Sequence, residues 1–205
     1  MMHIAIEGID GVGKTTMARE LAKRLGFKCV EKHLHALLDG EDIDAIPNYM
    51  RVTSEINASD NPTLRAWFYA LGNLYLREHY GDIDIVTDRY FASNYSWNGT
   101  QDNMFIFEKL IDILGKPEIS FLVYANPQVR EERIRRRNPN DADLANADAS
   151  FSETMYGKLN GFLESHGFNY HVIDTSNLNI EESITLMQKI LAKEFPSKIP
   201  QINPK

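Results

Sequence analysis

Short apolar runs alternate along the chain with longer segments in which hydrophobic residues recur every three or four positions. The runs are typical of strands covered on both faces, and the periodic segments are typical of helices with one buried face. The runs predict five strands, at His3–Glu7, Lys28–Glu31, Ile83–Thr87, Ile119–Tyr124 and Tyr170–Ile173. The periodic segments predict six helices, at Lys14–Leu25, Leu64–Tyr80, Phe105–Leu114, Pro127–Arg137, Phe151–Glu164 and Ile180–Phe195. This alternation indicates an α/β fold with a parallel sheet.

Domain organisation follows from the same pattern. No repeat or linker divides the 205 residues, so we predict a single domain over residues 1–195. The stretch Asn138–Ser150 is polar and poorly periodic, which predicts a mobile loop within a lid at about residues 134–152. Three prolines in the last ten residues predict an irregular tail at 196–205.

Composition narrows the class of protein. A hydrophobic content of 43% and a charged content of 25% are ordinary for a folded domain, and the net charge of −7 disfavours binding to nucleic acid. The single cysteine, Cys29, excludes an internal disulfide framework, and we expect it to be a small core residue. The chain shows neither a membrane-spanning apolar run nor a signal peptide, so we expect a cytoplasmic protein without membrane contact.

A glycine-rich loop carries the strongest chemical signal. Residues Gly8–Thr15 read GIDGVGKT, which matches G-x-x-x-x-G-K-[ST] between a predicted strand and a predicted helix. In such loops backbone N–H groups surround phosphate oxygens, a lysine reaches the β and γ phosphates, and a hydroxyl holds Mg²⁺. The candidate ATP-binding residues here are Gly8, Gly11, Val12, Gly13, Lys14, Thr15 and Thr16.

Acidic and basic residues beside this loop suggest a second ligand. Asp10 would repel a triphosphate if it faced one, so we expect it to point toward a ligand with hydroxyl groups. Asp88 and Arg89 directly follow the third predicted strand. This position places Asp88 beside the loop, where it could support Mg²⁺, and places the Arg89 fork at the mouth of the site.

Five arginines fall within residues 130–137 of this acidic chain. Arg133 and Arg137 lie four residues apart and therefore share a helix face, and we interpret them as lid residues that stabilise the transferring phosphoryl group. We expect the other three, Arg130, Arg135 and Arg136, to form a solvated charged face.

Motifs along most of the chain resemble those of thymidylate kinases. The family's phosphate loop, E-G-x-[DE]-x-x-G-K-[ST]-T, is matched by residues 7–16, and its D-R-Y-x-x-S motif by residues 88–93. Its K-P-[DE] turn is matched by residues 116–118 and its I-D-[AT]-S end by residues 173–176. The resemblance implies a P-loop NTPase fold with a five-stranded parallel sheet, a mobile lid, ATP with Mg²⁺ as donor, and a homodimer.

The resemblance also implies residue roles. Asp10 corresponds to the carboxylate near the acceptor's sugar and phosphate, and Arg89 to the clamp on the acceptor phosphate. Asn94 corresponds to a contact on the base side, and Trp97 to an aromatic that packs on the sugar and disfavours a 2′-hydroxyl. Arg133 and Arg137 correspond to lid arginines that bind the donor, which adds them to the candidate ATP-binding residues. Together these give Lys14, Arg89, Arg137 and Asp10 as candidate catalytic residues.

Two positions depart from the family pattern. The arginine-containing run after the second strand is replaced by Val30-Glu31-Lys32-His33, in which Lys32 offers a point charge but no bidentate fork. The family's stacking phenylalanine and base-reading arginine are replaced by Tyr69 and Asn73. Asn carries both a donor and an acceptor, so Asn73 could pair with a pyrimidine edge.

The chemistry of the acceptor leaves three hypotheses. A monophosphate is already ionised and needs positive clamps but no general base. Asp10 in the phosphate loop and the run Asp88-Arg89-Tyr90 after the third strand favour this acceptor, with dTMP as the substrate. A nucleoside hydroxyl benefits from a carboxylate base, and Glu31 at the end of the second strand could serve as that base in a deoxynucleoside kinase. A regulatory ATP-binding module would need no acceptor residues, which leaves Asp10, Arg89, Asn94 and Trp97 without a role.

Overall fold

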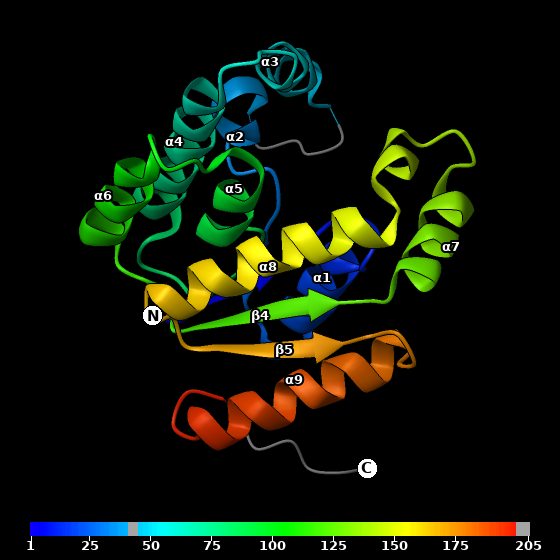
Figure 1. Ribbon diagram of the computed structural model, residues 1–205. Coiled ribbons are helices and arrows are strands. Elements are labelled where there is room, and N and C mark those ends of the chain that lie inside the picture. Colours follow the sequence, from blue (N-terminus) through cyan, green and yellow to red (C-terminus); the bar gives the residue numbers. More distant parts are fainter. Residues whose placement is uncertain (41–44, 200–205) are drawn as a thin grey trace.

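Five parallel strands form one sheet in a computed structural model of the protein, which describes residues 1–40 and 45–199. The strand order is β2–β3–β1–β4–β5, and Figure 1 shows the edge strand β5 beside β4. The strands span β1 His3–Glu7, β2 Lys28–Val30, β3 Ile85–Asp88, β4 Ile119–Tyr124 and β5 Tyr170–Asp174. The predicted five-stranded parallel sheet is confirmed, with strand ends displaced by at most two residues.

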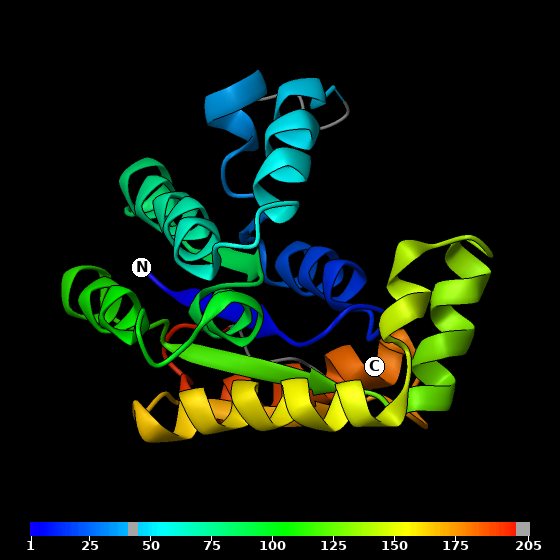
Figure 2. The same ribbon diagram turned by 45° about the horizontal axis from the view of Figure 1, so that its top comes forward.

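Helices cover both faces of this sheet. The two that contact each other on one face are α1 Lys14–Leu25 and α9 Ile180–Glu194. The opposite face is covered by the contacting helices α4 Pro62–Tyr80, α5 Phe91–Asn98, α6 Met104–Leu114 and α8 Ala149–Ser165. The remaining helices are α2 His35–Asp39, α3 Pro47–Asn57 and α7 Pro127–Arg137, together with the 3₁₀ helix η1 Ala142–Asn146. Figure 2 shows α2 and α3 projecting away from the body of the molecule.

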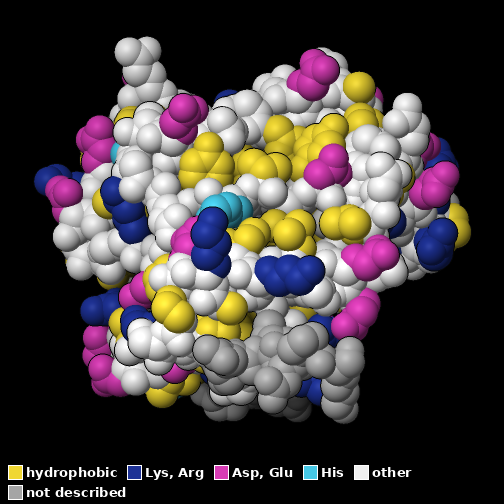
Figure 3. All heavy atoms as spheres, turned by 90° about the horizontal axis from the view of Figure 1, so that it is seen from below, with side chains coloured by type: hydrophobic (Ala, Val, Ile, Leu, Met, Phe, Trp, Pro, Cys, Tyr) yellow, Lys and Arg dark blue, Asp and Glu magenta, His cyan; other side chains and the backbone are white. Residues whose placement is uncertain are grey.

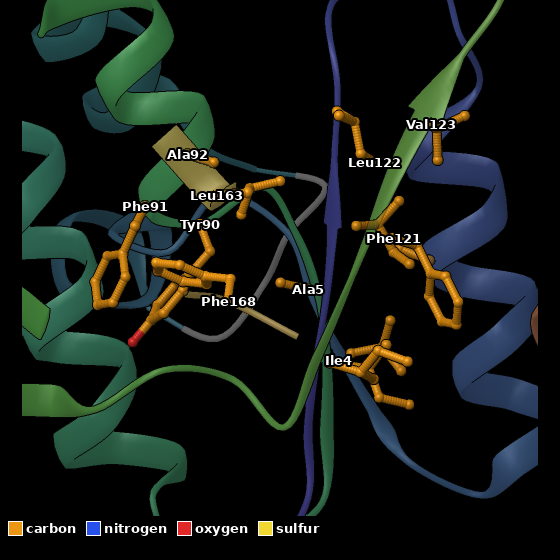
Figure 4. Close-up of a cluster of buried hydrophobic side chains, with 14 of the residues drawn as sticks. Ile4, Ala5, Tyr90, Phe91, Ala92, Phe121, Leu122, Val123, Leu163 and Phe168 are labelled. Carbon is orange, nitrogen blue, oxygen red and sulfur yellow. The ribbon is translucent and has the colours of Figure 1, made fainter. Parts of the chain in front are cut away.

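The core lies on both sides of the two central strands. Figure 4 shows Ile4 and Phe121 on one side of the sheet, and Ala5 with Tyr90 and Phe168 on the other. All five side chains are buried. The apolar residues of β1 and β4 therefore enter the core on both faces of the sheet, which explains why these strands read as apolar runs.

Local signals set many helix ends. The side chain of Asn61 caps α4 ahead of Pro62, and that of Asn126 caps α7 ahead of Pro127. Asn179 and Glu182 form a reciprocal capping box at α9. These side chains satisfy N–H groups that a helix leaves without partners.

Three helices were not predicted. Helix α5 is buried on nearly all sides, so it has no polar face to reveal a helical period. Helix α3 has the opposite character, because Thr53 is its one buried residue and few hydrophobic positions mark a buried face. Helix α2 spans five residues, too few to show a period.

The prediction of a loop at residues 138–150 was wrong in part. Asp141 caps η1 through the N–H of Asp143, and Asp148 caps α8 through the N–H of Phe151. The polar residues that suggested an irregular loop are therefore helix caps and the surface of η1. At the start of the expected tail, residues 196–199 form a turn and a bend; Ile199 is buried, and Lys198 Nζ donates to the carbonyl of Met1 at 2.9 Å. The rest of the tail, 200–205, lies outside the described residues.

The surface is charged with both signs. On the face seen from below, basic and acidic side chains are interspersed around a band of hydrophobic ones (Figure 3). None of the helices in the described part of the chain has the length and apolar character needed to cross a membrane. Cys29 is half-buried on β2 and packs against the core.

Candidate active site

A cavity of about 780 Å³ opens at the carboxyl ends of the central strands. Its floor includes Asp10 after β1 and Arg89 after β3, one side carries Tyr49 of α3, and the other carries Asn146 of η1. Figure 1 shows α3 and the α7–η1 segment rising on either side of this region. Parallel sheets bind ligands at this edge, so the cavity is the candidate active site.

The glycine-rich loop closes tightly onto the sheet. Gly8 has φ 145°, and a Cβ there would lie 2.6 Å from the carbonyl oxygen of Val123, so a side chain is excluded. Gly13 begins α1 in the left-handed conformation without a side-chain cap, which leaves the first N–H groups of α1 available to an anion.

Lys14 is held inside the loop. Its Nζ donates to the carbonyl of Ile9 at 2.6 Å and lies 3.7 Å from Asp10 Oδ1. Burial, and then the nearby Arg89 guanidinium, lower the pKa of Lys14 to about 8, although Asp10 opposes this effect. The ammonium therefore stays mostly protonated at pH 7, although its pKa lies closer to neutrality than that of a free lysine.

Asp10 and Arg89 meet at the cavity floor. Arg89 donates through Nη2 to Asp10 and through Nη1 to the carbonyl of Gly8 at 3.1 Å. Burial disfavours the charged carboxylate, but Arg89 and Lys14 outweigh it and hold the pKa of Asp10 at about 2. Both side chains line the cavity.

The backbone at Arg89 is unusual. With φ 75°, it is the one non-glycine residue of the described chain with positive φ. Its N–H donates to the carbonyl of Ile6 at 2.9 Å, which ties the end of β3 to β1. A left-handed conformation costs a side-chain-bearing residue about 1–2 kcal/mol, and here it turns the guanidinium toward the glycine-rich loop.

Thr15 and Asp88 form the candidate metal contact. Thr15 Oγ1 donates to Asp88 Oδ2, while Asp88 Oδ1 is buried without a hydrogen-bond partner. Oxygen atoms of this kind suit Mg²⁺, so the pair fits the expected ion. Among residues 1–40 and 45–199, no group of three His, Cys, Asp or Glu side chains could hold a metal, so phosphate oxygens and water would have to supply most ligands.

The predicted acceptor residues lie together along the cavity wall, and several already have partners. Tyr69 donates its hydroxyl to Asn57 Oδ1 at 2.8 Å. Asn94 donates to the carbonyl of Ala66 and accepts from Asn98, both at 3.0 Å, so its amide is committed to the fold. Trp97 is 38% exposed at the cavity, and Lys32 is exposed there as well.

Asn73 is buried in the same wall beside a histidine that the sequence did not single out. Its Oδ1 lies 3.2 Å from His33 Nδ1, while Asn73 Nδ2 and His33 Nε2 are buried without partners. Burial lowers the pKa of His33 to about 4, so the ring is neutral at pH 7. No sequence motif marks His33, and its proximity to Asn73 of α4 arises only from the fold.

The lid arginines differ in their surroundings. Arg133 donates to the carbonyl of Val12 at 3.3 Å and to Thr175 Oγ1 at 2.9 Å, so it braces the glycine-rich loop. Arg137 is half-exposed and pairs with Asp141 and Asp143 of the lid. Arg133 therefore contacts the glycine-rich loop, whereas Arg137 pairs with carboxylates of the lid.

The expectation of a solvated face holds for Arg135, which pairs with Glu131 on the surface, and for the exposed Arg136. It was wrong for Arg130, whose side chain is 1% exposed. Periodicity within an arginine run does not show which member turns inward, because the deciding contacts come from distant segments.

Glu31 lies in the cavity wall with a partner that the sequence did not indicate. Its Oε2 accepts from Arg19 Nη2 at 2.8 Å, and its Oε1 accepts from Arg19 Nε. Arg19 is on α1, five residues after Lys14, and no motif marks it. Both carboxylate oxygens are therefore engaged by one guanidinium fork.

Comparison with known proteins agrees with this geometry. The family model described as thymidylate kinase matches residues 6–186. A probable thymidylate kinase from Methanocaldococcus jannaschii is 28% identical over 188 residues, covering 88% of this chain and 90% of the relative. Another from Saccharolobus solfataricus is 28% identical over 198 residues, covering 92% and 97%.

Solved structures share the fold. A thymidylate kinase from Candida albicans has a TM-score of 0.65 at 15% identity, with 94% of this chain and 92% of that chain covered. A deoxyadenosine kinase from M. mycoides has a TM-score of 0.61 at 19% identity, with 94% and 100% covered. Because the family model matches most of the chain, this chain belongs to the thymidylate kinase family and is a nucleotide kinase, a phosphotransferase.

Proposed function

We propose that the protein transfers the γ-phosphoryl group of ATP to dTMP, which forms dTDP and ADP. The observation that carries the proposal is one cavity whose floor joins the glycine-rich loop to Arg89 and Asp10. Lys14 and the N-terminus of α1 would receive the donor phosphates, and Arg89 would receive a phosphate that is already ionised. The family match and its curated relatives support the same substrate.

On the donor side, the protein would position the phosphates of ATP and neutralise their negative charge. Lys14 would leave the carbonyl of Ile9 for a phosphate oxygen, and this contact would raise its pKa. Arg133 would keep the loop in place, and Arg137 would exchange a lid carboxylate for the transferring group. Mg²⁺ bound to ATP, held by Thr15 and Asp88, would neutralise charge that develops between the phosphates.

On the acceptor side, Arg89 would clamp the monophosphate, while Asp10 keeps the guanidinium oriented and accepts from a sugar hydroxyl. Trp97 would pack on the sugar, and Lys32 would add a point charge. Asn73, with Tyr69 nearby, would face the base, and its unpartnered Nδ2 is a donor that suits a pyrimidine carbonyl. Closure of the lid would exclude water that competes for the phosphoryl group.

A coupled ADP-release assay tests this proposal. ATP and Mg²⁺ are held constant, and thymidine, deoxyadenosine, deoxycytidine and their 5′-monophosphates are compared. We expect dTMP to give the highest kcat/KM. Turnover of a nucleoside without turnover of any monophosphate would overturn the proposal, and acceptor-independent ATP hydrolysis alone would indicate a regulatory ATP-binding module.

A deoxynucleoside kinase is the second candidate, because Glu31 lies in the cavity wall where a base could act. A general base needs an oxygen that is free to take a proton, and both Glu31 oxygens accept from Arg19. The Glu31→Gln variant should therefore keep kcat for dTMP within about threefold, whereas loss of a general base costs about 10²–10⁴-fold. Glu20→Gln on the same helix as Arg19 is the matched control.

We also propose a cytoplasmic homodimer. Leu64, Trp67 and Leu71 form an exposed apolar stripe on α4, and Phe105 of the neighbouring α6 packs 6.4 Å from the Trp67 ring. Such a stripe is typical of an interface. Light scattering should give twice the chain mass, and Trp67→Glu should give a monomer, whereas a monomeric parent protein would exclude this assembly.

A further inference from the structure

Arg130 joins three segments that are distant in the sequence. From α7 its Nε donates to the carbonyl of Asp10 at 2.8 Å, its Nη1 donates to Ser152 Oγ on α8, and its Nη2 donates to the carbonyl of Asn146 in η1. The phosphate loop and both parts of the lid are thus held by one planar group, which fixes their relative geometry.

The acceptors of this guanidinium are uncharged. None of the ion pairs found in the described parts of the chain includes Arg130, and burial lowers its pKa. A buried cation bonded only to carbonyl and hydroxyl oxygens is costly to keep, so the arrangement is not explained by a gain in stability. A role in positioning the three segments explains it.

The phosphate loop is shaped to receive the Arg130 stem. Gly11 has φ 85°, and a Cβ at this position would lie 2.8 Å from Arg130 Cγ and 2.7 Å from Ile134 Cγ1. Any side chain at residue 11 would displace α7, and with it the lid. Loop and lid therefore fit together at this point.

A line of contacts continues from Arg130 to the acceptor end of the cavity. The Arg130 guanidinium lies 5.7 Å from the centroid of the Phe151 ring, which in turn lies 5.6 Å from the ring of Trp97. Trp97 lines the cavity, and Phe151 does not. Movement of the lid at Arg130 would therefore reach the acceptor site through Phe151.

We propose that Arg130 is a positioning residue that fastens the lid to the phosphate loop and, through Phe151, sets the position of Trp97, so that the donor and acceptor sites are coupled. This inference rests on the proposed function only in naming the nucleotides that bind at the two sites. The contacts themselves are independent of which nucleotide is phosphorylated.

Fluorescence provides a readout that needs no substrate. The chain has two tryptophans, and Trp67→Phe leaves Trp97 as the sole tryptophan, whose emission is excited selectively over that of tyrosine. In this background Arg130→Met, which keeps the stem and removes the guanidinium, should increase acrylamide quenching of Trp97. Phe151→Leu should also increase the quenching of Trp97. The double variant should show no more quenching than the single variants, within experimental error. Arg135→Met is the matched control, because Arg135 is exposed and pairs with Glu131 of the same helix.

Kinetics provide the second readout. Arg130→Met should raise the KM of both ATP and the acceptor, the acceptor KM by about tenfold, which corresponds to about 1.4 kcal/mol. The ratio of ATP hydrolysis to phosphoryl transfer should also rise. If Arg130→Met does not fold, Ser152→Ala removes one of the three bonds and should give smaller shifts in the same directions.

Arg130→Met could instead lower the melting temperature while its Trp97 quenching and its KM values equal those of Arg135→Met. That result would show a purely structural role for Arg130 and overturn the inference. Failure to phosphorylate dTMP would instead contradict the proposed function. The two failures are distinguishable because the quenching measurement uses no nucleotide.

Discussion

At the scale of single residues, the site depends on two positive side chains that share one negative side chain. Lys14 and Arg89 share the single carboxylate of Asp10, so an incoming phosphate meets an excess of positive charge. Motif reading predicted all three residues, because the spacing of the loop and the position after β3 are local properties. Arg130, His33 and Arg19 could not be predicted, because their partners are 12 to 120 residues away in the sequence.

The pKa of Lys14 leads to a pH dependence. Since the protonated ammonium binds phosphate and its pKa is about 8 in the free protein, kcat/KM for ATP should fall as pH rises above 8, approaching tenfold per pH unit. Asp10 raises this pKa, so Asp10→Asn should move the break to lower pH. Initial-rate profiles from pH 6 to 9.5 test this, with circular dichroism confirming that the fold persists. A profile that is flat to pH 9.5 would contradict the assignment.

At the scale of secondary structure, β1 positions both the phosphate loop and the turn that carries Arg89. The last residue of β1, Glu7, is buried, and its carboxylate accepts from the N–H groups of Ala92 and Ser93 at 3.1 and 3.0 Å. It thereby caps α5, whose own N-cap residue, Tyr90, makes no side-chain cap. The strands and the amphipathic helices could be predicted from periodicity, whereas α5 depends on a glutamate 84 residues before its first residue and could not.

Replacement of this remote cap should destabilise the fold. Glu7→Ala leaves buried N–H groups without an acceptor, at a cost of about 1–3 kcal/mol. The free energy of unfolding in urea measures the loss. Glu108→Ala, which removes an exposed carboxylate on α6, should stay within about 0.5 kcal/mol of the parent protein. Equal stabilities of the two variants would show that Glu7 does not act as a cap.

At the scale of the whole molecule, two histidines remain neutral in the fold, namely His3, which is buried on β1, and His33, which is half-buried after β2. Burial lowers the pKa of His3 to about 3 and that of His33 to about 4. In the unfolded chain both would titrate near 6.5. Between pH 6.5 and 4 the unfolded chain therefore binds more protons than the folded one, and stability decreases as the solution is acidified.

Chemical denaturation at several pH values tests this expectation. The free energy of unfolding should fall by up to about 1.4 kcal/mol per pH unit for each histidine as pH decreases from 6.5 to 4. His3→Gln, which can still bond with Thr87, should reduce the slope by about one histidine. A parent protein with constant stability across this interval would show that the rings are not kept neutral.

Because the backbone of Arg89 is left-handed, a substitution at this position can favour the stability of the protein while it abolishes activity. Glycine adopts a φ of 75° freely, so Arg89→Gly should be more stable than Arg89→Ala by about 1 kcal/mol, although both lack the guanidinium and should be nearly inactive. Calorimetry and the coupled assay on the two purified variants separate these effects, and equal melting temperatures would contradict the expectation. In a library that covers every substitution, a selection for soluble yield would retain glycine at position 89 and a selection for turnover would discard it.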